Sequence, residues 1–351
     1  MTNTKIRVLI VDDSAVIRYL LTEILNQAGD IEVIGTAQDP IFAGQKIRDL
    51  RPDVITLDIE MPRMDGLTFL GELMKTDPIP VVMVSALTQK GCETTIKALE
   101  LGAVDYVPKP QINISVGITN LADDIINKVR IASKARVKKV QKHGSDLENL
   151  FSQPRYNQFE LKTTTDKIIA IGASTGGTQA IREIITALPE ATPGIVIAQH
   201  MPPLFISTFA ARLNSISRLD VKEAHPGDRV IRGTVLIAPG DDHMILRRNG
   251  AMYYTEIKHG PLVNFVRPSV DVLFSTVAKY AGENAIGIIL TGMGEDGAKG
   301  LLRMKEAGAF TIAQDEESSM VFGMPKKAIE LNAVDKVASL TDIPKIILEH
   351  I

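Results

Sequence analysis

Short apolar runs rich in Val and Ile recur along the chain, and stretches with helical periodicity separate them. In the first third, strand-like runs such as IRVLIV, DVITLD and VVMVSA alternate with amphipathic stretches such as AVIRYLLTEILNQAG. Nearly continuous apolar strands that alternate with helices predict a parallel sheet with both faces covered by helices. The alternation resumes after residue 166 with KIIAIG, GIVIAQH, TVLIAPG and AIGIILTG. We therefore expect an α/β protein with two doubly wound parallel-sheet domains.

The length and the changes of pattern divide the chain into three parts. Its 351 residues suffice for about two domains, each large enough to bury a core of its own. The first domain is expected at residues 1–125, with a last helix that runs from Leu121 to about Lys142. Residues 143–166 lose the periodicity and collect Ser, Thr, Asn, Gln and Pro, which is typical of a linker. The second domain is expected at residues 167–351.

Composition excludes several classes of partner and location. A net charge of -3 is not that of a nucleic-acid-binding protein, which would usually carry a basic excess. No apolar run approaches the roughly 18 residues that would cross a bilayer. Two acids follow the short first apolar run at once, which argues against a secretory signal, and the single cysteine, Cys92, has no internal disulfide partner. We expect a cytoplasmic protein that does not insert into membranes.

Polar side chains follow the strand-like runs of the first domain. In an open parallel sheet these positions meet at the carboxyl edge, where ligands bind. Three crowded carboxylates repel one another unless a cation neutralises them, and an oxygen-rich cluster suits Mg²⁺. A lysine would add a positive charge for a phosphoryl group, and a carboxylate is able to accept that group. The residues at these positions are Asp12, Asp13, Asp58, Ser85 and Lys109.

With the segments VDDS, DIEMPRMDG and VPKP, this half resembles the receiver domain of two-component response regulators over residues 5 to about 125. The resemblance implies a flavodoxin-like fold and a phospho-acceptor at Asp58. It also implies that Asp12 and Asp13 help to hold Mg²⁺ together with Asp58. Ser85 would then contact the phosphoryl group and Lys109 would pair with it. Tyr106 stands where receivers keep an aromatic residue that moves on activation.

The segment IGASTGG opens the second domain and has two interpretations. A phosphate-binding loop would need G-x-G-x-x-G or a Walker lysine, and neither is present. The spacing Gly172, Ser174 and Gly176 instead fits a strand-to-helix elbow, in which small neighbours let a strained serine project its hydroxyl from the sheet edge. The segment therefore favours a nucleophilic serine at position 174.

A nucleophilic serine requires a histidine base and an acid that orients it. Among six histidines, His200 ends the run GIVIAQH and is expected on the same edge as Ser174, whereas His225 and His243 fall in segments that we interpret as turns. Glu295 and Asp296 follow AIGIILTGMG, and Asp296 is also a good N-cap for the next helix. Chemistry alone does not choose between these two acids.

A second resemblance makes that choice. Together IGASTGG, AQHMP, APGDDHM, FVRPSVDVLF, LTGMGEDG and QDEESSMVFGMP resemble the catalytic domain of the chemotaxis response-regulator methylesterases, the CheB type, from about Lys167 to the C-terminus. Carried over by motif, Ser174 is the nucleophile, His200 the base and Asp296 the acid. The backbone amides of Thr175 and Met293 are the implied oxyanion donors, and ester hydrolysis needs no cofactor.

The combined resemblance implies a phosphorylation-activated serine hydrolase of chemotactic adaptation. Its substrates would be γ-glutamyl methyl esters on the helices of chemoreceptors, which release methanol, and certain receptor glutamines, which it would deamidate. A chemotaxis histidine kinase would supply the phosphoryl group. We hypothesise that the unphosphorylated receiver covers the edge that bears Ser174. Three alternatives stay open: a binding module with a vestigial triad, an esterase for small esters, and a nucleotide-binding loop.

Overall fold

The computed structural model describes residues 5–86, 88–110, 118–139 and 167–351. The chain forms two compact units that divide between Lys142 and His143. The linker expected at residues 143–166 lies outside the described residues. Among the described helices, none has the length and apolar character that a membrane span requires.

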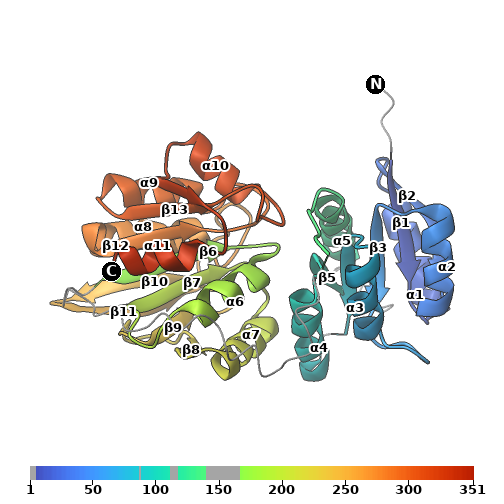
Figure 1. Ribbon diagram of the computed structural model, residues 1–351, viewed down its shortest axis with the longest axis horizontal. Helices are drawn as coiled ribbons and strands as arrows, with labels where there is room; N and C mark the ends of the chain where they lie inside the picture. The colour runs from blue at the N-terminus through green and yellow to red at the C-terminus, as the bar shows by residue number, and fades with distance from the viewer. Residues whose placement is uncertain (1–4, 87, 111–117, 140–166) are drawn as a thin grey trace. The chain divides into compact units, whose positions relative to one another are not determined.

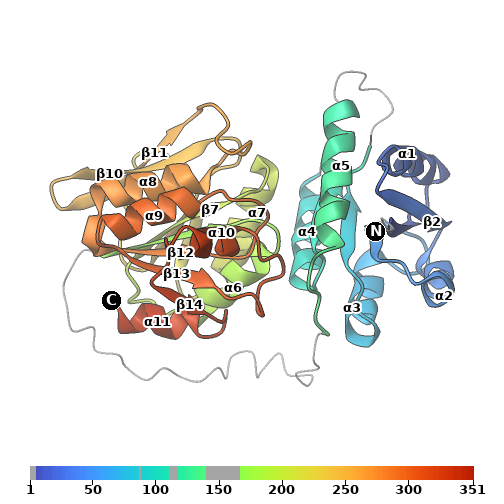
Figure 2. The same ribbon diagram turned by 90° about the horizontal axis from the view of Figure 1, so that it is seen from above.

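The first unit is built on a five-stranded parallel sheet with the strand order β2-β1-β3-β4-β5 (Figure 1). Its strands are β1 (Ile6–Val11), β2 (Ile31–Ala37), β3 (Val54–Asp58), β4 (Val81–Ser85) and β5 (Asp105–Pro108). Its helices are α1 (Ala15–Asn26), α2 (Pro40–Leu50), α3 (Gly66–Thr76), α4 (Gln89–Glu100) and α5 (Ile118–Ala132). Helices α1 and α5 pack together on one face, and α3 and α4 on the other (Figure 2). The flavodoxin-like order predicted for this half is confirmed.

Burial and capping explain these elements. All residues of β3 and β4 are buried, as expected for central strands that are covered by helices on both faces. Four of the helices begin after a residue whose side-chain oxygen accepts a hydrogen bond from a backbone amide of the first turn, which satisfies an otherwise unpaired donor. These N-cap residues are Ser14, Asp39, Asp65 and Thr88.

The expected extent of the last helix of the first unit was wrong. The helix begins at Ile118 and ends at Ala132, rather than running from Leu121 to about Lys142. Beyond Ala132, which is buried, the apolar positions lose helical spacing, so no face remains to pack against the unit. Lys134 and Lys138 would also stand four residues apart, where like charges disfavour a helix.

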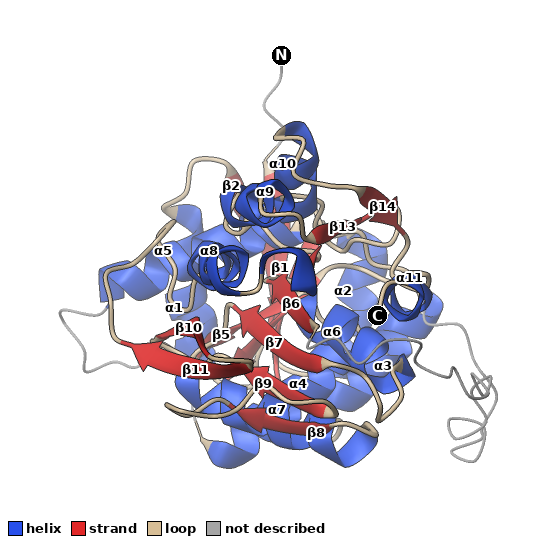
Figure 3. Cartoon of the chain, turned by 90° about the vertical axis from the view of Figure 1, so that its left-hand side faces the viewer, coloured by secondary structure: helices blue, strands red, loops and turns tan. Residues whose placement is uncertain are grey.

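The second unit contains a seven-stranded parallel sheet with the order β14-β13-β12-β6-β7-β9-β8. Its strands are β6 (Ile168–Ala173), β7 (Gly194–Gln199), β8 (Asp220–Glu223), β9 (Thr234–Ile237), β12 (Ala285–Ile289), β13 (Phe310–Gln314) and β14 (Lys336–Ala338). Its helices are α6 (Gly177–Ala187), α7 (Pro203–Ile216), α8 (Val270–Tyr280), α9 (Ala298–Glu306), α10 (Met324–Glu330), α11 (Ile343–Glu349) and the 3₁₀ helix η2 (Gly282–Asn284). Helices α8 and α9 cover one face, and α6 and α11 cover the other (Figures 2 and 3). The second parallel-sheet domain is thus also confirmed.

An antiparallel hairpin, β10 (His243–Asn249) with β11 (Met252–Lys258), adds to this unit and packs on α8 (Figure 3). The alternation in HMILRRN and MYYTEIK is typical of strands with one buried face. His243 therefore begins a strand, and our interpretation of its segment as a turn was wrong.

Both sheets are parallel, but the order in which successive strands are added reverses at one pair of neighbouring strands. In the first unit this pair is β1 and β3, and in the second it is β6 and β12. After such a pair, one connecting segment crosses to one face of the sheet and the other segment to the opposite face. A crevice therefore opens beyond the carboxyl ends of the two strands. The residues after these four strands are the acids of the first domain, Ser174 and the loop that contains Asp296. The fold therefore brings each predicted site to a position suited to bind a ligand.

Candidate active site and phospho-acceptor site

Ser174 lies in a tight turn between β6 and α6. The Gly177 amide donates to the Ser174 carbonyl at 2.7 Å, and the Ser174 amide donates to the Thr291 carbonyl in the loop after β12 at 3.1 Å. The left-handed conformation that the turn requires falls on Gly176, with φ of 78°, where a residue without Cβ has no steric penalty. Our expectation of a strained serine was therefore wrong, because the positive φ of this turn is at Gly176 and not at Ser174.

His200 follows β7, which pairs with β6 in the register Ala173 to Gln199. The next residues along the two strands are Ser174 and His200, and the His200 amide donates to the Ala173 carbonyl at 3.2 Å. The His200 side chain is 13% exposed, and its Nε2 lies 2.8 Å from Asp296 Oδ2. In the described residues no hydrogen bond joins Ser174 Oγ to His200. The structure thus brings base and acid into contact and places the serine beside them on the neighbouring strand.

Asp296 is buried against the N-terminus of α8, not at the N-cap of α9, which is Gly297. Its Oδ1 accepts hydrogen bonds from the Asn264 Nδ2 and the Ser269 Oγ, each at 2.7 Å. Its Oδ2 accepts from the Val270 amide at 2.6 Å, beside the contact with His200. Free amides at a helix start favour a carboxylate. The acid is therefore held in place by groups that all donate hydrogen bonds.

The hydrogen-bond donors decide the ionisation of this carboxyl. Burial pushes the pKa of Asp296 up, but the hydrogen bonds from His200, Ser269 and Asn264 outweigh it and hold the pKa below its ordinary value. An ionised carboxylate at Oδ2 fixes the proton of His200 on Nε2, which leaves Nδ1 as the ring nitrogen that can accept a proton. Glu295, by contrast, is exposed. The geometry therefore favours Asp296 over Glu295 as partner of the histidine.

Three residues beside Asp296 were missed from the sequence: Asn264, Ser269 and Asp271. Asn264 donates to both Asp271, at 2.8 Å, and Asp296. Ser269 donates through its hydroxyl to Asp296 and through its amide to Nδ1 of the buried His243, at 3.1 Å. Each of the three lies in the segment FVRPSVDVLF or just before it, yet their partners are remote in sequence. The available signal was local: Ser269 suits a helix N-cap and Asp271 suits a first turn, and neither preference identifies a remote partner.

The two expected oxyanion donors flank Ser174. Thr175 follows Ser174 in the turn, and the Thr291 hydroxyl donates to the Thr175 carbonyl at 3.0 Å. Met293 lies in the loop that also carries Asp296, and its side chain is 45% exposed. Gly292 in the same loop approaches Ser174 so closely that an added Cβ would lie 2.7 Å from the Ser174 Cβ. Within the described residues no group accepts a hydrogen bond from the Met293 amide. Both amides therefore lie on segments that adjoin the serine.

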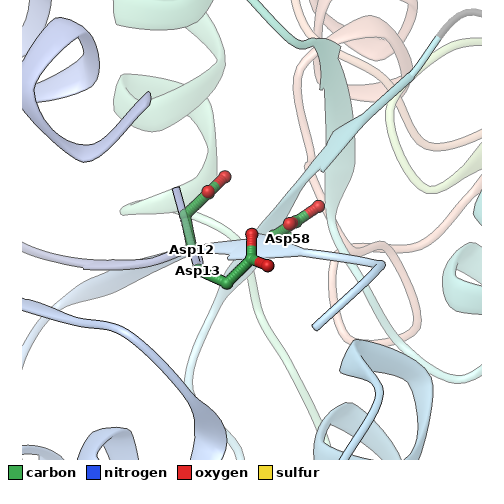
Figure 4. A group of neighbouring side chains, drawn as sticks. All are labelled: Asp12, Asp13 and Asp58. Carbon is green, nitrogen blue, oxygen red and sulfur yellow. The ribbon is translucent and has the colours of Figure 1, made fainter. Parts of the chain in front are cut away.

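In the first unit, one oxygen from each of Asp12, Asp13 and Asp58 lies within 4.8 Å of the others (Figure 4). Asp12 and Asp58 are buried, and Asp13 is exposed. Asp12 Oδ2 is buried without a hydrogen-bond partner among the described residues. Such an orphaned oxygen is costly unless it binds a proton or a cation. Three clustered carboxylates with an unsatisfied oxygen fit a hard, oxygen-preferring cation such as Mg²⁺.

Burial raises the pKa of two of these acids. Burial and the Asp58 charge raise the pKa of Asp12 to about 6. Burial also raises the pKa of Asp58, although its ion pair with Lys109 opposes the change. Lys109 Nζ lies 2.7 Å from Asp58 Oδ2 and 3.9 Å from Asp12 Oδ2. One lysine is thus shared by two buried carboxyls, which leaves them short of positive charge.

The other two residues predicted for this site, Ser85 and Tyr106, contact the helices beside the sheet. Ser85 is buried at the end of β4, and its Oγ accepts a hydrogen bond from the Thr95 hydroxyl of α4 at 2.8 Å. No hydrogen bond between Ser85 and Asp58 occurs in the part of the chain that the structure describes. Tyr106 is buried in β5, where Lys128 Nζ stands 4.8 Å from its ring centre and donates to its carbonyl at 2.6 Å. The structure therefore gathers Asp12, Asp13, Asp58 and Lys109, and holds Ser85 and Tyr106 toward the adjoining helices.

The raised pKa of Asp12 predicts a pH-dependent affinity for Mg²⁺. A carboxyl group must lose its proton before it binds a cation. With a folded-state pKa of about 6, most Asp12 is ionised at pH 7 and most is protonated at pH 5. We expect calorimetric titration to give about tenfold weaker Mg²⁺ binding at pH 5 than at pH 7, for one linked proton. Asp12→Asn should bind weakly with a shallower pH slope. Equal wild-type affinity at both pH values would contradict the site.

Comparison with known proteins agrees with the two-part architecture. The family described as response regulator receiver domain matches residues 8–116, and the family described as CheB methylesterase matches residues 169–347. The matched ranges fall on the two sheets separately. The candidate catalytic residues and the acid cluster thus lie in ranges that match two different families.

Whole-chain relatives share both parts. A protein-glutamate methylesterase/protein-glutamine glutaminase of Geobacter metallireducens is 53% identical over 98% of this chain and 96% of its own length. A relative of the same name from Syntrophus aciditrophicus is 54% identical over 97% of each chain. The crystal structure of the Thermotoga maritima CheB methylesterase catalytic domain is 42% identical, covers 53% of this chain and all of that domain, and has a TM-score of 0.52.

Proposed function

Because the chain belongs to the CheB methylesterase family, with a response regulator receiver domain before its catalytic domain, we propose that it removes methyl groups from glutamate methyl esters of chemoreceptors in chemotactic adaptation. It is a carboxylic ester hydrolase that releases methanol, and it also deamidates receptor glutamines. Both reactions transfer the same γ-acyl group and differ only in the leaving group. The observation that carries the proposal is the contact of His200 with the buried, ionised Asp296, beside Ser174 on the neighbouring strand.

The reaction begins with attack of Ser174 Oγ on the γ-carbonyl carbon. His200 Nδ1 takes the hydroxyl proton, since Nε2 is committed to Asp296. The carbonyl oxygen becomes an oxyanion that the amides of Thr175 and Met293 are proposed to hold. A positioned amide of this kind is typically worth about 10²–10³ in turnover.

Collapse of this intermediate breaks the bond to the methoxy or amino group. His200 returns the proton, so that methanol or ammonia departs and the γ-acyl group stays on Ser174. Water then attacks the acyl-enzyme and gives its proton to the same nitrogen, and Ser174 leaves with that proton as the glutamate is freed. Asp296 keeps the imidazole in one tautomer throughout. The chain supplies every group that these steps require, so we propose no cofactor for ester hydrolysis.

The receiver controls this chemistry through Asp58. We propose that Asp12, Asp13 and Asp58 would hold Mg²⁺, and that the bound ion would neutralise charge during phosphoryl transfer. Lys109 would pair with the phosphoryl oxygens, and Ser85 and Tyr106 would rearrange in response. A chemotaxis histidine kinase is the proposed phosphodonor, and the cytoplasm is the proposed location.

Asp58→Asn is expected to uncouple activity from the phosphodonor. With methylated receptor membranes, acetyl phosphate and Mg²⁺ should raise methanol release by the wild-type protein by about five- to 150-fold, the range of common coupling energies. The variant should stay at the basal rate because an amide is a poor phosphoryl acceptor. Asp77→Asn, at an exposed position of the same domain, is the matched control and should be activated normally. Activation of the Asp58→Asn protein would count against Asp58 as acceptor.

A further inference from the structure

A tight turn between β11 and α8 adopts an unusual backbone conformation. Val263 and Val266 exchange two hydrogen bonds, at 3.2 and 3.1 Å, around the two residues Asn264 and Phe265. These residues have φ of 52° and 65°. Two successive left-handed residues define a primed turn, which usually contains Gly, Asn or Asp. Asn264 suits this conformation, whereas a bulky phenylalanine in it is strained.

The strained residue is also the most exposed of the large hydrophobic residues that the structure describes. The exposed fraction of Phe265 is 94%, against 57% for Leu262 and 45% for Met293. An isolated exposed apolar residue is ordinary on a protein surface. A fully exposed aromatic ring on a strained backbone is not explained by folding, because the chain gains no burial from it. Such strain persists where the surroundings impose it, and it is common at functional sites.

The surroundings that impose this conformation belong to the active site. The side chain of Asn264 bridges two buried carboxylates, Asp271 at 2.8 Å and Asp296 at 2.7 Å. Asp296 in turn contacts His200. The exposed ring therefore belongs to the residue directly after Asn264, which helps to orient the proposed acid. Met293, on the loop that carries Asp296, presents a second exposed apolar side chain near the same edge.

We propose that Phe265 is the apolar anchor that docks the helical surface of the receptor next to the esterified glutamate. This inference rests on the proposed function. The esterified side chain belongs to a folded protein, so the enzyme must hold a surface around it and not only the reacting group. Aromatic residues often dominate such contacts. The two carboxylates hold Asn264, and with it the turn that carries the ring, so the backbone of this turn loses little conformational freedom on binding.

The test compares Phe265→Gly with Phe265→Tyr in the full-length phosphorylated protein. Glycine adopts positive φ without strain and keeps the turn while it removes the ring, whereas tyrosine keeps the ring. Methanol release is measured over a range of receptor concentrations. For the glycine variant we expect kcat/KM to fall about 30-fold, as for a hot-spot aromatic residue. The fall should be in KM, with kcat within about twofold of wild type, and the tyrosine variant should resemble wild type.

Two controls separate docking from damage to the triad. A short peptide with one glutamate γ-methyl ester lacks the helical surface, so wild type and Phe265→Gly should hydrolyse it equally. Met252→Ala removes another exposed apolar side chain, 48% exposed, which lines a cavity of about 260 Å³ with Lys167 and Gly194 at the starting ends of β6 and β7. Because that cavity lies at the opposite strand ends from Ser174, this variant should act on receptors as wild type does.

Four results would overturn the inference. Unchanged receptor kinetics in Phe265→Gly would remove the anchor, while wild-type methanol release in the same assay would leave the proposed function intact. An equal loss on receptor and peptide would assign the effect to Asn264 and the triad. A raised rate of the Phe265→Gly protein in a parallel assay without phosphodonor would assign Phe265 to a contact within the chain. No methanol release from receptors by wild type would reject the proposed function, and the anchor with it.

Discussion

Ser174→Ala is expected to lower methanol release from methylated receptors by about 10⁶-fold in kcat, as when the nucleophile of a serine hydrolase triad is removed. Without the hydroxyl no acyl-enzyme forms, and His200 has no proton to accept. The fold should be unaffected, because the Ser174 side chain makes no hydrogen bond among the described residues. Its structural bonds, to the Thr291 carbonyl and from the Gly177 amide, use the backbone and survive the substitution.

Ser215→Ala serves as the matched control. Ser215 is an exposed serine of α7 whose hydroxyl, among the described residues, donates only to the Arg212 carbonyl within its own helix, at 2.7 Å. This variant should keep full activity. Thermal unfolding should show equal stability for both variants within the usual scatter of surface substitutions, about 0.5 kcal/mol. Methanol release by the Ser174→Ala protein at the wild-type rate would support a binding module with a vestigial triad.

The sheets could be predicted from the sequence because their strands are nearly continuous apolar runs. The segments VITLD and VVMVS are buried at every residue, and this pattern specifies a central parallel strand whatever lies next to it. The hairpin that begins at His243 was less evident, because its strands are only partly buried and the turn residues just before it dominate the pattern. The end of α5 at Ala132 depended on where the apolar face finds something to pack against, which is a tertiary property.

The proposed site could be predicted only as far as strand ends determine it. Ser174 and His200 follow neighbouring strands, so the pairing of β6 with β7 brings them together. The choice between Glu295 and Asp296 needed the resemblance, because both acids follow the same strand. In the structure the choice follows from burial, since only Asp296 reaches the amides at the start of α8.

The orientation of the histidine could not be predicted from the sequence at all. In the serine-protease template the acid bonds to Nδ1 and the serine faces Nε2. Here Asp296 lies on Nε2, so the ring is turned and Nδ1 is the nitrogen left for the serine. This ring orientation depends on where the end of β7 places His200 and on where the start of α8 holds Asp296. The spacing of the motifs does not specify either position. The same proton transfer is available to Nδ1 in place of Nε2.

Asp296→Asn tests this arrangement most directly, and we expect it to lower methanol release by about 10⁴-fold, as for the acid of a comparable triad. Every partner of the two Asp296 oxygens is a donor: the Asn264 amide, the Ser269 hydroxyl, the Val270 and Asp271 backbone amides and His200 Nε2. An asparagine must direct its NH₂ group at one of these sets. If the NH₂ faces His200, it also opposes the Val270 amide, the imidazole proton moves to Nδ1 and the ring cannot accept the serine proton.

If the NH₂ instead faces Asn264 and Ser269, donors oppose one another in a buried site. Either orientation should therefore cost about 1–3 kcal/mol of unfolding free energy for an unsatisfied buried group, seen as a lowered melting temperature. Glu295→Gln makes the same chemical change at the adjacent exposed acid and should leave rate and stability near those of wild type. A large loss in Glu295→Gln with a small one in Asp296→Asn would reverse the assignment. If only Asp296→Asn loses rate and stability, the start of α8 holds the carboxylate that sets the His200 tautomer on which catalysis depends.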